Sequence, residues 1–291
     1  MNVDDPYAAA IEIAKAARSP MERAAAALDP VRYRIFCAAY ASMRVIDDFV
    51  DDAFLARPLA ARAETRPAAL ATVRDWERRA TAALETGAAP PAGDRFRSTH
   101  QALAATHGIA RLDPMPWRRL AGAMARDVEE AAMPDWDAFL AYAEGATAAP
   151  AAVFIEILAL APDAAGGRLE SRLDGPAVDR IRNAAVLLYL VHIMRDLAED
   201  AAKGTGLLTL PQALFRDMGL DSVRFAALAP ADPALVDRAR GEVARFAGRF
   251  LAPALAEIED LGEALAPAEA RILEGLCVPY IERYAEFAGN S

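Results

Sequence analysis

Two short acidic clusters lie far apart in this 291-residue chain, and each repeats its carboxylates at a spacing of four residues. The first is the run DDFVDD at residues 47–52, and the second is DLAED at residues 196–200. In an α-helix this spacing stacks carboxylates on one face, roughly 6 Å apart along the axis. Because like charges so close together repel, a bound cation would stabilise them. Mg²⁺ is the natural candidate, since it binds carboxylate oxygens and completes its shell with waters and phosphate oxygens.

An arginine accompanies each cluster: Arg44 lies one turn before the first, and Arg195 directly precedes the second. A guanidinium matches the geometry of phosphate oxygens, so both arginines are candidates for binding a phosphate group. The alternative is that they only pair with carboxylates on their own helix. His192 lies one turn before Asp196 and two turns before Asp200. Metal ligation, phosphate contact and plain packing all stay open for this histidine.

Each cluster lies in a helix-forming stretch that is apolar on most faces, at residues 30–56 and 176–203. A helix that is hydrophobic all round belongs in the centre of a protein. Carboxylates on two such helices need compensation, because unpaired buried charge is expensive. We therefore expect the two helices to face each other across a cavity that is acidic at its mouth and apolar below. The alternative is a solvated acidic helix face, and the matched second cluster argues against it.

The rest of the chain predicts further helices and no strand. Ala, Leu, Arg and Glu dominate, and no run shows the alternation of apolar and polar residues that is typical of strands. We expect one all-α domain over residues 1–291, with helices at 5–18, 20–28, 30–56, 66–86, 94–108, 114–131, 135–161, 176–203, 211–228, 233–264 and 267–288.

Local signals indicate where these helices begin and end. Gly204-Thr205-Gly206 predicts a helix C-cap or a flexible lid. His100 and His107 have no partner signature and predict surface positions. Four pairs are typical of an N-cap followed by a first helical proline: Ser19-Pro20, Asp29-Pro30, Asp113-Pro114 and Asp232-Pro233.

Composition argues against several classes of protein. With 55% hydrophobic and 25% charged residues, the chain is typical of a folded globular protein. Its net charge of −10, with scattered arginines and lysines, argues against a nucleic-acid partner. Cys37 and Cys277 predict buried, reduced thiols. The apolar runs 146–162 and 184–194 predict no membrane span. Residues 1–5 lack the apolar core of a signal peptide, so we expect a cytoplasmic protein and leave open a peripheral contact with the inner membrane surface.

The clusters and their flanking segments resemble the squalene/phytoene synthase family of head-to-head prenyltransferases. The family's first aspartate motif resembles residues 40–52 (YASMRVIDDFVDD), and its second resembles residues 194–204 (MRDLAEDAAKG), followed by Leu210-Pro211. Residues 124–127 (MARD) and 142–145 (YAEG) resemble two segments that lie between those motifs. Order and separations fit along roughly residues 30–215, and the paired motifs are more specific than either alone.

The chain departs from the family's pattern at five places. Residues 18–21 (RSPM) replace a Ser/Lys/Ser-Phe phosphate contact, and residues 146–152 (ATAAPAA) lack the usual glycines and hold a proline. His192 occupies the position of an Asn or similar amide, and Tyr189 the position of a Gln. The family's C-terminal basic and aromatic residues have no clear match after Ala270.

The resemblance implies a class I isoprenoid synthase-like helical bundle around a central cavity, and it implies roles for particular residues. For His192, where the chain departs from the family, we instead expect from its chemistry that a protonated imidazole, held by Asp196, donates a charge-assisted hydrogen bond to a diphosphate. The implied catalytic residues are Asp47, Asp51, Asp196, Asp200 and Tyr40. The implied substrate-binding residues are Arg44, Arg195, Tyr142, His192 and Lys203. The implied metal ligands are Asp47, Asp48, Asp51, Asp196 and Asp200.

The implied reaction joins two prenyl diphosphates, farnesyl or geranylgeranyl, head to head with loss of pyrophosphate and with Mg²⁺ as cofactor. Mn²⁺ in place of Mg²⁺, a need for NADPH, and a monomer or a homodimer all stay open. One alternative is a terpene cyclase-like enzyme that acts on one prenyl diphosphate, as the altered small-residue helix allows. Another is a non-catalytic assembly-factor relative of the same fold; the survival of both clusters argues against it.

Overall fold

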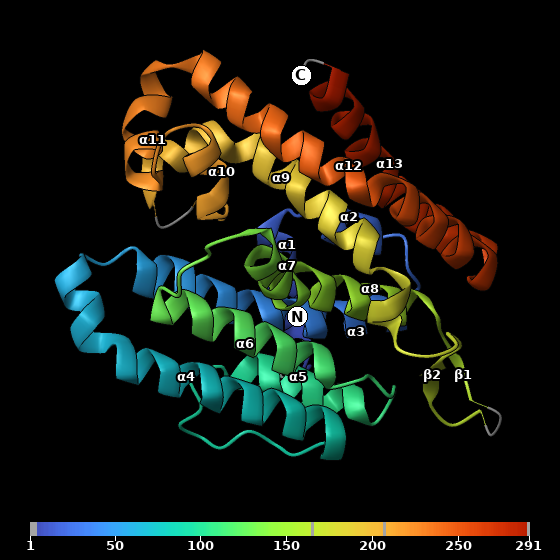
Figure 1. Ribbon diagram of the computed structural model, residues 1–291. Coiled ribbons are helices and arrows are strands. Elements are labelled where there is room, and N and C mark those ends of the chain that lie inside the picture. Colours follow the sequence, from blue (N-terminus) through green and yellow to red (C-terminus); the bar gives the residue numbers. More distant parts are fainter. Residues whose placement is uncertain (1–4, 164–165, 206–207, 290–291) are drawn as a thin grey trace.

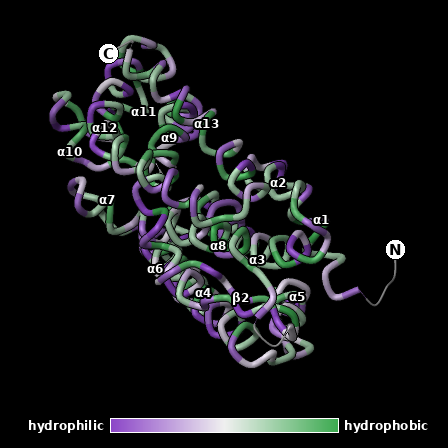
Figure 2. The backbone as a smooth tube through the Cα atoms, turned by 90° about the vertical axis from the view of Figure 1, so that its right-hand side faces the viewer, coloured by the Kyte–Doolittle hydropathy of each residue, from purple (hydrophilic) through white to green (hydrophobic). Residues whose placement is uncertain are grey.

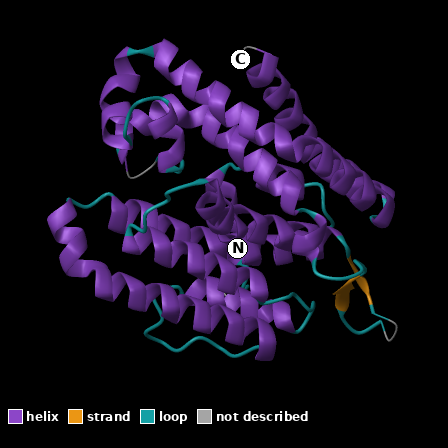
Figure 3. Ribbon diagram, in the orientation of Figure 1, coloured by secondary structure: helices purple, strands orange, loops and turns teal. Residues whose placement is uncertain are grey.

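The protein is almost entirely helical in its computed structural model, which describes residues 5–163, 166–205 and 208–289 (Figure 3). Two short strands, β1 (Leu160–Pro162) and β2 (Leu169–Ser171), pair antiparallel at the margin of the molecule. The expectation of no strand is wrong at this hairpin. Three residues are too few for an alternating pattern to be visible in the sequence.

The helices fall into two groups (Figure 1). In one group α9 packs along α12, and α12 packs against α13. In the other, α3 (Pro30–Asp48) packs against α5 (Arg97–His107), and α4 (Leu59–Thr86) packs against α5 and α6 (Met115–Glu129). The first group and its connections comprise the 3₁₀ turn η3 (Ala177–Arg180), α9 (Arg182–Lys203), α10 (Gln212–Asp217), α11 (Ser222–Leu228), the 3₁₀ turn η5 (Ala229–Ala231), α12 (Pro233–Ala264) and α13 (Pro267–Gly289).

The second group comes from the N-terminal half of the chain. α1 packs against α3, and the segment from α7 to α8 lies between α6 and α9. Its elements are α1 (Ala8–Ala17), α2 (Pro20–Ala25), α3 (Pro30–Asp48), the π-helix η1 (Phe49–Leu55), α4 (Leu59–Thr86), α5 (Arg97–His107), α6 (Met115–Glu129), α7 (Trp136–Ala143), the π-helix η2 (Glu144–Ala148) and α8 (Ala149–Leu158).

Three of the four predicted helix starts are confirmed by their caps. The Ser19 hydroxyl accepts the Glu22 N–H at 3.0 Å, and the Asp29 carboxylate accepts the Val31 N–H at 2.9 Å. The carboxylate of Asp232 caps α12 in the same way. These bonds satisfy N–H groups that have no partner inside the helix. At the fourth site the helix begins one residue later than predicted, at Met115.

Several predicted helices have different bounds in the structure; the helix predicted from residue 176 begins as α9 only at Arg182, after the 3₁₀ turn η3. α4 begins at Leu59 rather than at residue 66, because Arg62 and Arg66 both pair with Glu130 and hold the first turns of α4 against the end of α6. The predicted helix 211–228 divides into α10 and α11. Gly219 lies between them with a φ of 74°, a conformation that glycine adopts without strain.

The buried side chains of the two groups form one hydrophobic core. Hydrophobic stretches of α3 and α8 lie in the middle of the molecule, and hydrophilic stretches lie mainly toward its outside (Figure 2). Trp76 and Trp117 are fully buried, and both indole N–H groups donate to Ser42, at 3.0 Å to its carbonyl and 3.3 Å to its hydroxyl. Cys37 and Cys277 are buried free thiols, as predicted.

One stretch is long and apolar enough to cross a membrane, at Trp136–Leu158. This stretch runs from α7 through η2 to α8, and 56% of its most apolar window is buried inside the protein. Packing against α6 and α9 accounts for its hydrophobicity.

Candidate active site

Both acidic clusters line one pocket of about 360 Å³ between the two groups of helices, called the acidic pocket below. The expectation that carboxylates from two helices share a cavity is therefore confirmed. Apolar walls come from Leu55, Met124, Ile193, Leu197 and Leu208. The polar and charged residues of its lining are Arg44, Asp47, Asp51, Asp127, Tyr142, Tyr189, His192, Asp196, Asp200 and Thr209.

The first cluster lies where α3 changes from an α-helix to a π-helix. α3 ends at Asp48, and η1 follows without a break. The prediction of an α-helix over residues 30–56 is correct in extent but wrong in type after Asp48. A π-helix has a wider turn than an α-helix, and such turns occur frequently at functional sites. The wider turn changes the angle at which the later carboxylates of the cluster project.

Only half of the first cluster faces the acidic pocket. Asp47 and Asp51 line it, whereas Asp52 is exposed outside it. Asp48, a predicted metal ligand, is not part of the lining and pairs with Arg44 at 2.5 Å. Arg44 also lies 3.5 Å from Asp47, so one guanidinium links both carboxylates. Metal ligation by these residues stays a prediction.

The protein around the first cluster disfavours its negative charge. The Asp47 side chain is 40% exposed, but it faces the acidic pocket rather than an open surface. Burial, followed by the charges of Asp47 and Asp52, raises the pKa of Asp51 to about 7. Burial also raises the pKa of Asp47, against the opposing effect of Arg44. The single nearby guanidinium leaves these carboxylates undercompensated, as a cation site requires.

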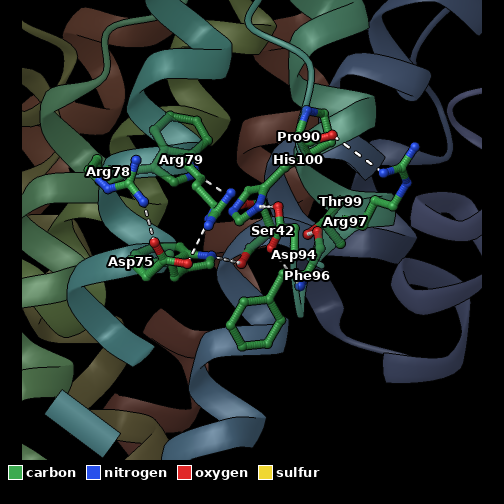
Figure 4. Close-up of polar contacts among 12 residues, drawn as sticks. Ser42, Asp75, Arg78, Arg79, Pro90, Asp94, Phe96, Arg97, Thr99 and His100 are labelled. Carbon is green, nitrogen blue, oxygen red and sulfur yellow. Dashed lines mark hydrogen bonds and ion pairs between the residues drawn. The ribbon is translucent and has the colours of Figure 1, made fainter. Parts of the chain in front are cut away.

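The loop before α5 holds the π-helix in place. Phe49, the first residue of η1, meets Phe96 edge to face at 6.3 Å between ring centroids, and the Arg95 guanidinium lies 4.7 Å from the Phe49 centroid. Asp94 fixes this loop, since it accepts the Phe96 N–H at 2.9 Å and bonds to His100 Nδ1 at 2.6 Å (Figure 4). The predicted surface position of His100 is wrong, because the residue is 1% exposed.

The second cluster lies on a regular α-helix and has its own positive charges. Arg195 donates two hydrogen bonds of 2.7 Å to the two carboxylate oxygens of Asp196. These bonds lower the pKa of Asp196. Lys203 pairs with Glu199 at 2.7 Å. Asp200 makes no such pair among the described residues, and burial raises its pKa.

Nδ1 of His192 is a hydrogen-bond acceptor in this arrangement, and protonation of the imidazole beside a bound diphosphate stays a prediction. Arg195 donates to His192 Nδ1 at 2.8 Å, and an arginine cannot accept a hydrogen bond, so Nδ1 carries no proton. Partial burial lowers the pKa of His192, and the charge of Arg195 lowers it further. The ring's other nitrogen, Nε2, lies 3.4 Å from Asp196. The neutral ring can donate from Nε2 toward the acidic pocket.

Asp127 was absent from the predicted site. It lies on α6, lines the acidic pocket and accepts a hydrogen bond of 2.9 Å from the Tyr142 hydroxyl. Burial raises the pKa of Asp127 to about 7, against the lowering effect of that hydrogen bond. Tyr189 and Thr209 line the same pocket. The MARD segment and the unusual Tyr189 were the only signals in the sequence, and neither indicated proximity to the two clusters.

Two predicted site residues lie outside the pocket lining. Tyr40 stacks on Phe36 at 5.4 Å between ring centroids, one turn of α3 before Arg44. Lys203 lies at the end of α9 with its ammonium on Glu199. Gly204 is the C-cap of α9, with a φ of 118°, as the sequence predicted. Gly206, the last residue of the predicted lid, lies outside the described residues.

The donor set of the acidic pocket fits a hard divalent cation. The candidate ligands are carboxylates, the groups that Mg²⁺ and Mn²⁺ prefer. Within residues 5–163, 166–205 and 208–289, no three His, Cys, Asp or Glu side chains lie close enough together to hold one metal ion by themselves. An ion held by one or two of these aspartates would therefore need waters or phosphate oxygens as its other ligands.

Comparison with known proteins gives a family and a fold. The model of the squalene/phytoene synthase family matches residues 14–284. A crystal structure of a dehydrosqualene synthase in complex with ligand superposes with a TM-score of 0.62 at 18% identity, covering 92% of this chain and 84% of that one. The squalene synthase HpnC from Alicyclobacillus acidocaldarius superposes with a TM-score of 0.67 at 19% identity, covering 97% and 92%. A search of curated protein sequences finds no significant match.

Proposed function

The chain belongs to the squalene/phytoene synthase family of prenyltransferases, and from this premise we propose that it joins two prenyl diphosphates head to head with Mg²⁺ as cofactor. The substrates are farnesyl or geranylgeranyl diphosphate, and each condensation releases pyrophosphate. The observation that supports this proposal is the acidic pocket itself, where Asp47 and Asp51 of one helix meet Asp196 and Asp200 of another.

Some residues of the acidic pocket would bind the metal ions, and others would bind the diphosphate directly. Asp47, Asp51, Asp196 and Asp200 would hold the divalent ions, which neutralise the charge that develops on the departing pyrophosphate. Arg44 lies between the carboxylates of the first cluster and donates to phosphate oxygens from one side. Arg195 and the Nε2–H of His192 donate from the other helix. Both helices are packed in the core, so these donors are in position before the substrate binds.

A second set of residues controls water and protons below the diphosphate. Leu55, Met124, Ile193 and Leu197 line the pocket with apolar surface, which excludes water that would quench a carbocation. The Tyr142 hydroxyl, hydrogen-bonded to Asp127, can hold or move a proton beside the reacting carbon. Because the pKa of Asp127 is about 7, this carboxylate exchanges its proton near neutral pH.

The product identifies the reaction. Purified protein would be incubated with Mg²⁺ and farnesyl or geranylgeranyl diphosphate, with and without NADPH, and the organic extract analysed by mass spectrometry. A C30 or C40 product supports the proposal and assigns the chain length. Cyclic products from a single prenyl unit would favour the terpene cyclase alternative. No product from either substrate would favour a non-catalytic protein, and full turnover in excess chelator would contradict the metal requirement.

Asp51 and Asp52 provide a matched pair for this assay. Asp51 lines the acidic pocket, whereas its neighbour Asp52 is exposed outside it. Both are aspartates on the same π-helix, so their substitution by Asn is the same chemical change at neighbouring positions. A loss of product in Asp51→Asn that does not occur in Asp52→Asn would assign the activity to this pocket. The cytoplasmic location, a peripheral membrane contact and the choice between monomer and homodimer stay predictions.

A further inference from the structure

A buried acid–histidine pair lies near the first acidic cluster but outside the acidic pocket. Asp94 lies in the loop before α5, and His100 lies on the first turn of α5 (Figure 4). Each side chain is 1% exposed, and the Asp94 carboxylate lies 2.6 Å from His100 Nδ1. Neither residue lines the acidic pocket, so neither can bind substrate or metal there. The role of the pair must therefore lie in what it holds in place.

Among the described residues, the imidazole of His100 makes one hydrogen bond, and that bond is to Asp94. A carboxylate oxygen accepts, so Nδ1–H donates to Asp94. Burial lowers the pKa of His100, although the bond to Asp94 opposes this effect. Nε2 finds no hydrogen-bond partner in the described part of the chain. An unbonded nitrogen in the core costs free energy that an apolar side chain would avoid, so packing alone does not account for a histidine here.

The other carboxylate oxygen of Asp94 fixes the loop before α5. Oδ1 accepts the Phe96 N–H at 2.9 Å, and the Asp94 N–H donates to the Pro91 carbonyl at 3.2 Å. An aspartate that accepts a hydrogen bond from the backbone two residues further on stabilises a tight turn. Because one carboxylate bonds to both Phe96 and His100, it fastens this turn to α5.

The ring of Phe96 contacts both His100 and the π-helix η1. It meets the His100 imidazole edge to face at 6.2 Å between ring centroids, and it meets Phe49 in the same way at 6.3 Å. Phe49 is the first residue of η1, directly after Asp48 and two residues before Asp51. A displacement of Phe96 would therefore change the packing of the residue at which the π-helix begins.

The π-helical turn needs such contacts. π-helices are rare, and uncommon backbone conformations persist where the surrounding structure holds them. Two contacts of Phe49 come from the loop, namely the Phe96 ring and the Arg95 guanidinium, which lies 4.7 Å from the Phe49 centroid. The direction in which Asp51 projects depends on this turn, because a regular α-helix would place the residue at a different angle around the axis.

We propose that Asp94 and His100 are positioning residues for the first carboxylate cluster of the acidic pocket. The pair fixes the loop, the loop holds Phe49 through the ring of Phe96, and Phe49 holds the π-helical turn that directs Asp51 into the pocket. This role rests on the proposed function, because it assigns Asp51 to the divalent ions. Residues that orient a metal ligand without touching the metal typically contribute about ten- to a hundredfold to metal affinity.

Metal binding tests this role without turnover. Mn²⁺ alone is titrated into the full-length protein, and free Mn²⁺ is measured by electron paramagnetic resonance. His100→Phe keeps a ring in the core but loses the donor to Asp94, so it should bind Mn²⁺ about tenfold more weakly than wild type. His100→Asn should stay within about threefold, because its amide nitrogen is as many bonds from the backbone as Nδ1 and donates to Asp94. Asp51→Asn should lose the binding, which identifies the measured site as the acidic pocket.

His107→Phe is the matched control. His107 is the last residue of α5 and does not line the acidic pocket, and its Nδ1 lies 2.8 Å from the Leu84 carbonyl oxygen. The control removes one histidine hydrogen bond from the same helix, and its Mn²⁺ affinity should stay within about twofold of wild type. Equal losses in the two Phe variants, or wild-type affinity in His100→Phe, would overturn the positioning role alone. No Mn²⁺ binding by the wild type would overturn the proposed metal site as well.

Phe96→Ala tests the connection through the loop. Phe96 is half-buried, so this variant should fold even if a substitution at the buried His100 prevents folding. It should weaken Mn²⁺ binding about tenfold. The double variant Phe96→Ala/His100→Phe should lose no more affinity than either single variant, because both changes break the same connection. Additive losses, or wild-type affinity in Phe96→Ala, would overturn the proposal.

The Mg²⁺ dependence of the rate separates positioning from a general loss of structure. In His100→Phe the Mg²⁺ concentration that gives half the maximal rate should rise about tenfold, while the rate at saturating Mg²⁺ stays within about threefold of wild type. A merely structural defect reduces the amount of active protein. It would lower the rate at every Mg²⁺ concentration and leave the half-maximal concentration unchanged, and this result would overturn the proposal.

Discussion

The two acidic clusters carry similar carboxylates but are built in opposite ways. The first lies at a π-helical turn, where burial raises the pKa of Asp47 and Asp51 and one arginine serves several carboxylates. The second lies on a regular helix, where Arg195 lowers the pKa of Asp196. The first cluster therefore has too little positive charge for its carboxylates until a cation binds, whereas half of the second is already compensated by the protein.

The largest expected effect is on the rate of product formation. Here we expect the two clusters to behave alike. Asp51→Asn and Asp196→Asn should each lower product formation by about a thousandfold, because both remove charge stabilisation at the departing diphosphate. The measurement is the rate of product formation with saturating Mg²⁺. Asp52→Asn serves as the control and should stay within about threefold of wild type. Full activity in Asp51→Asn or in Asp196→Asn would show that the reaction does not need the cluster that the variant alters.

The next largest effect is on the stability of the metal-free protein, where the two clusters should differ in sign. The folded pKa of Asp51, about 7, lies above the unfolded value of 3.8, so the folded state binds the proton more tightly. The free energy of unfolding therefore falls as pH rises from about 4 to 7. Asp51→Asn removes this cost and should stabilise the protein at pH 8 by about 1–2 kcal/mol, which allows for partial solvation of the carboxyl.

Asp196 should show the opposite behaviour. Its folded pKa is lowered, so its contribution to stability is present above the unfolded pKa of 3.8 and is lost as pH falls below it. Asp196→Asn should therefore destabilise the protein at pH 8, by less than about 1 kcal/mol because the pair is at the surface. Chemical denaturation of both variants at pH 4 and pH 8, in chelator, measures these differences. Stabilisation by both substitutions would mean that the clusters do not differ.

A third prediction tests the pairing of Arg195 in the second cluster. Arg195→Lys keeps the charge but loses the fork that holds both oxygens of Asp196. We expect KM for the prenyl diphosphate to rise about tenfold with a smaller change in kcat, since the remaining ammonium binds phosphate less specifically. Arg245→Lys is the control, because Arg245 lies on α12, is 72% exposed and does not line the acidic pocket. An unchanged KM would show that the two hydrogen bonds from Arg195 to Asp196 do not position the groups that bind the prenyl diphosphate.

The smallest expected effect concerns His192. Because Arg195 already donates to Nδ1, the imidazole is neutral and should not titrate in the working range of the enzyme. His192→Asn keeps a donor at this position and should change the rate by less than about threefold, with the same pH profile. The measurement is the rate as a function of pH in both proteins. If the variant loses an inflection near neutral pH that the wild type shows, the imidazole is protonated once the diphosphate binds, as the sequence predicted.

The sequence determined the helices, most of their starts and the two carboxylate clusters. Ser19, Asp29 and Asp232 cap helices where they were predicted, because a cap depends on atoms only two or three residues away. The apolar character of the helices at 30–56 and 176–203 was sufficient to bring both clusters to one cavity, since such helices pack in the core. The paired motifs were also specific enough to identify the family.

Only the tertiary structure decided which carboxylates face the pocket and which of them hold a proton. Phe96 and Arg95 pack on Phe49 from another part of the chain, at the start of the π-helix that turns Asp51 inward. Asp127 joined the site from α6, although the MARD segment did not indicate that it lies near the two clusters, and the acceptor role of His192 Nδ1 followed from one bond to Arg195. Backbone caps are short-range, whereas burial and electrostatic interactions act through space. The ionisation of this site therefore depends on neighbours that are distant in the chain.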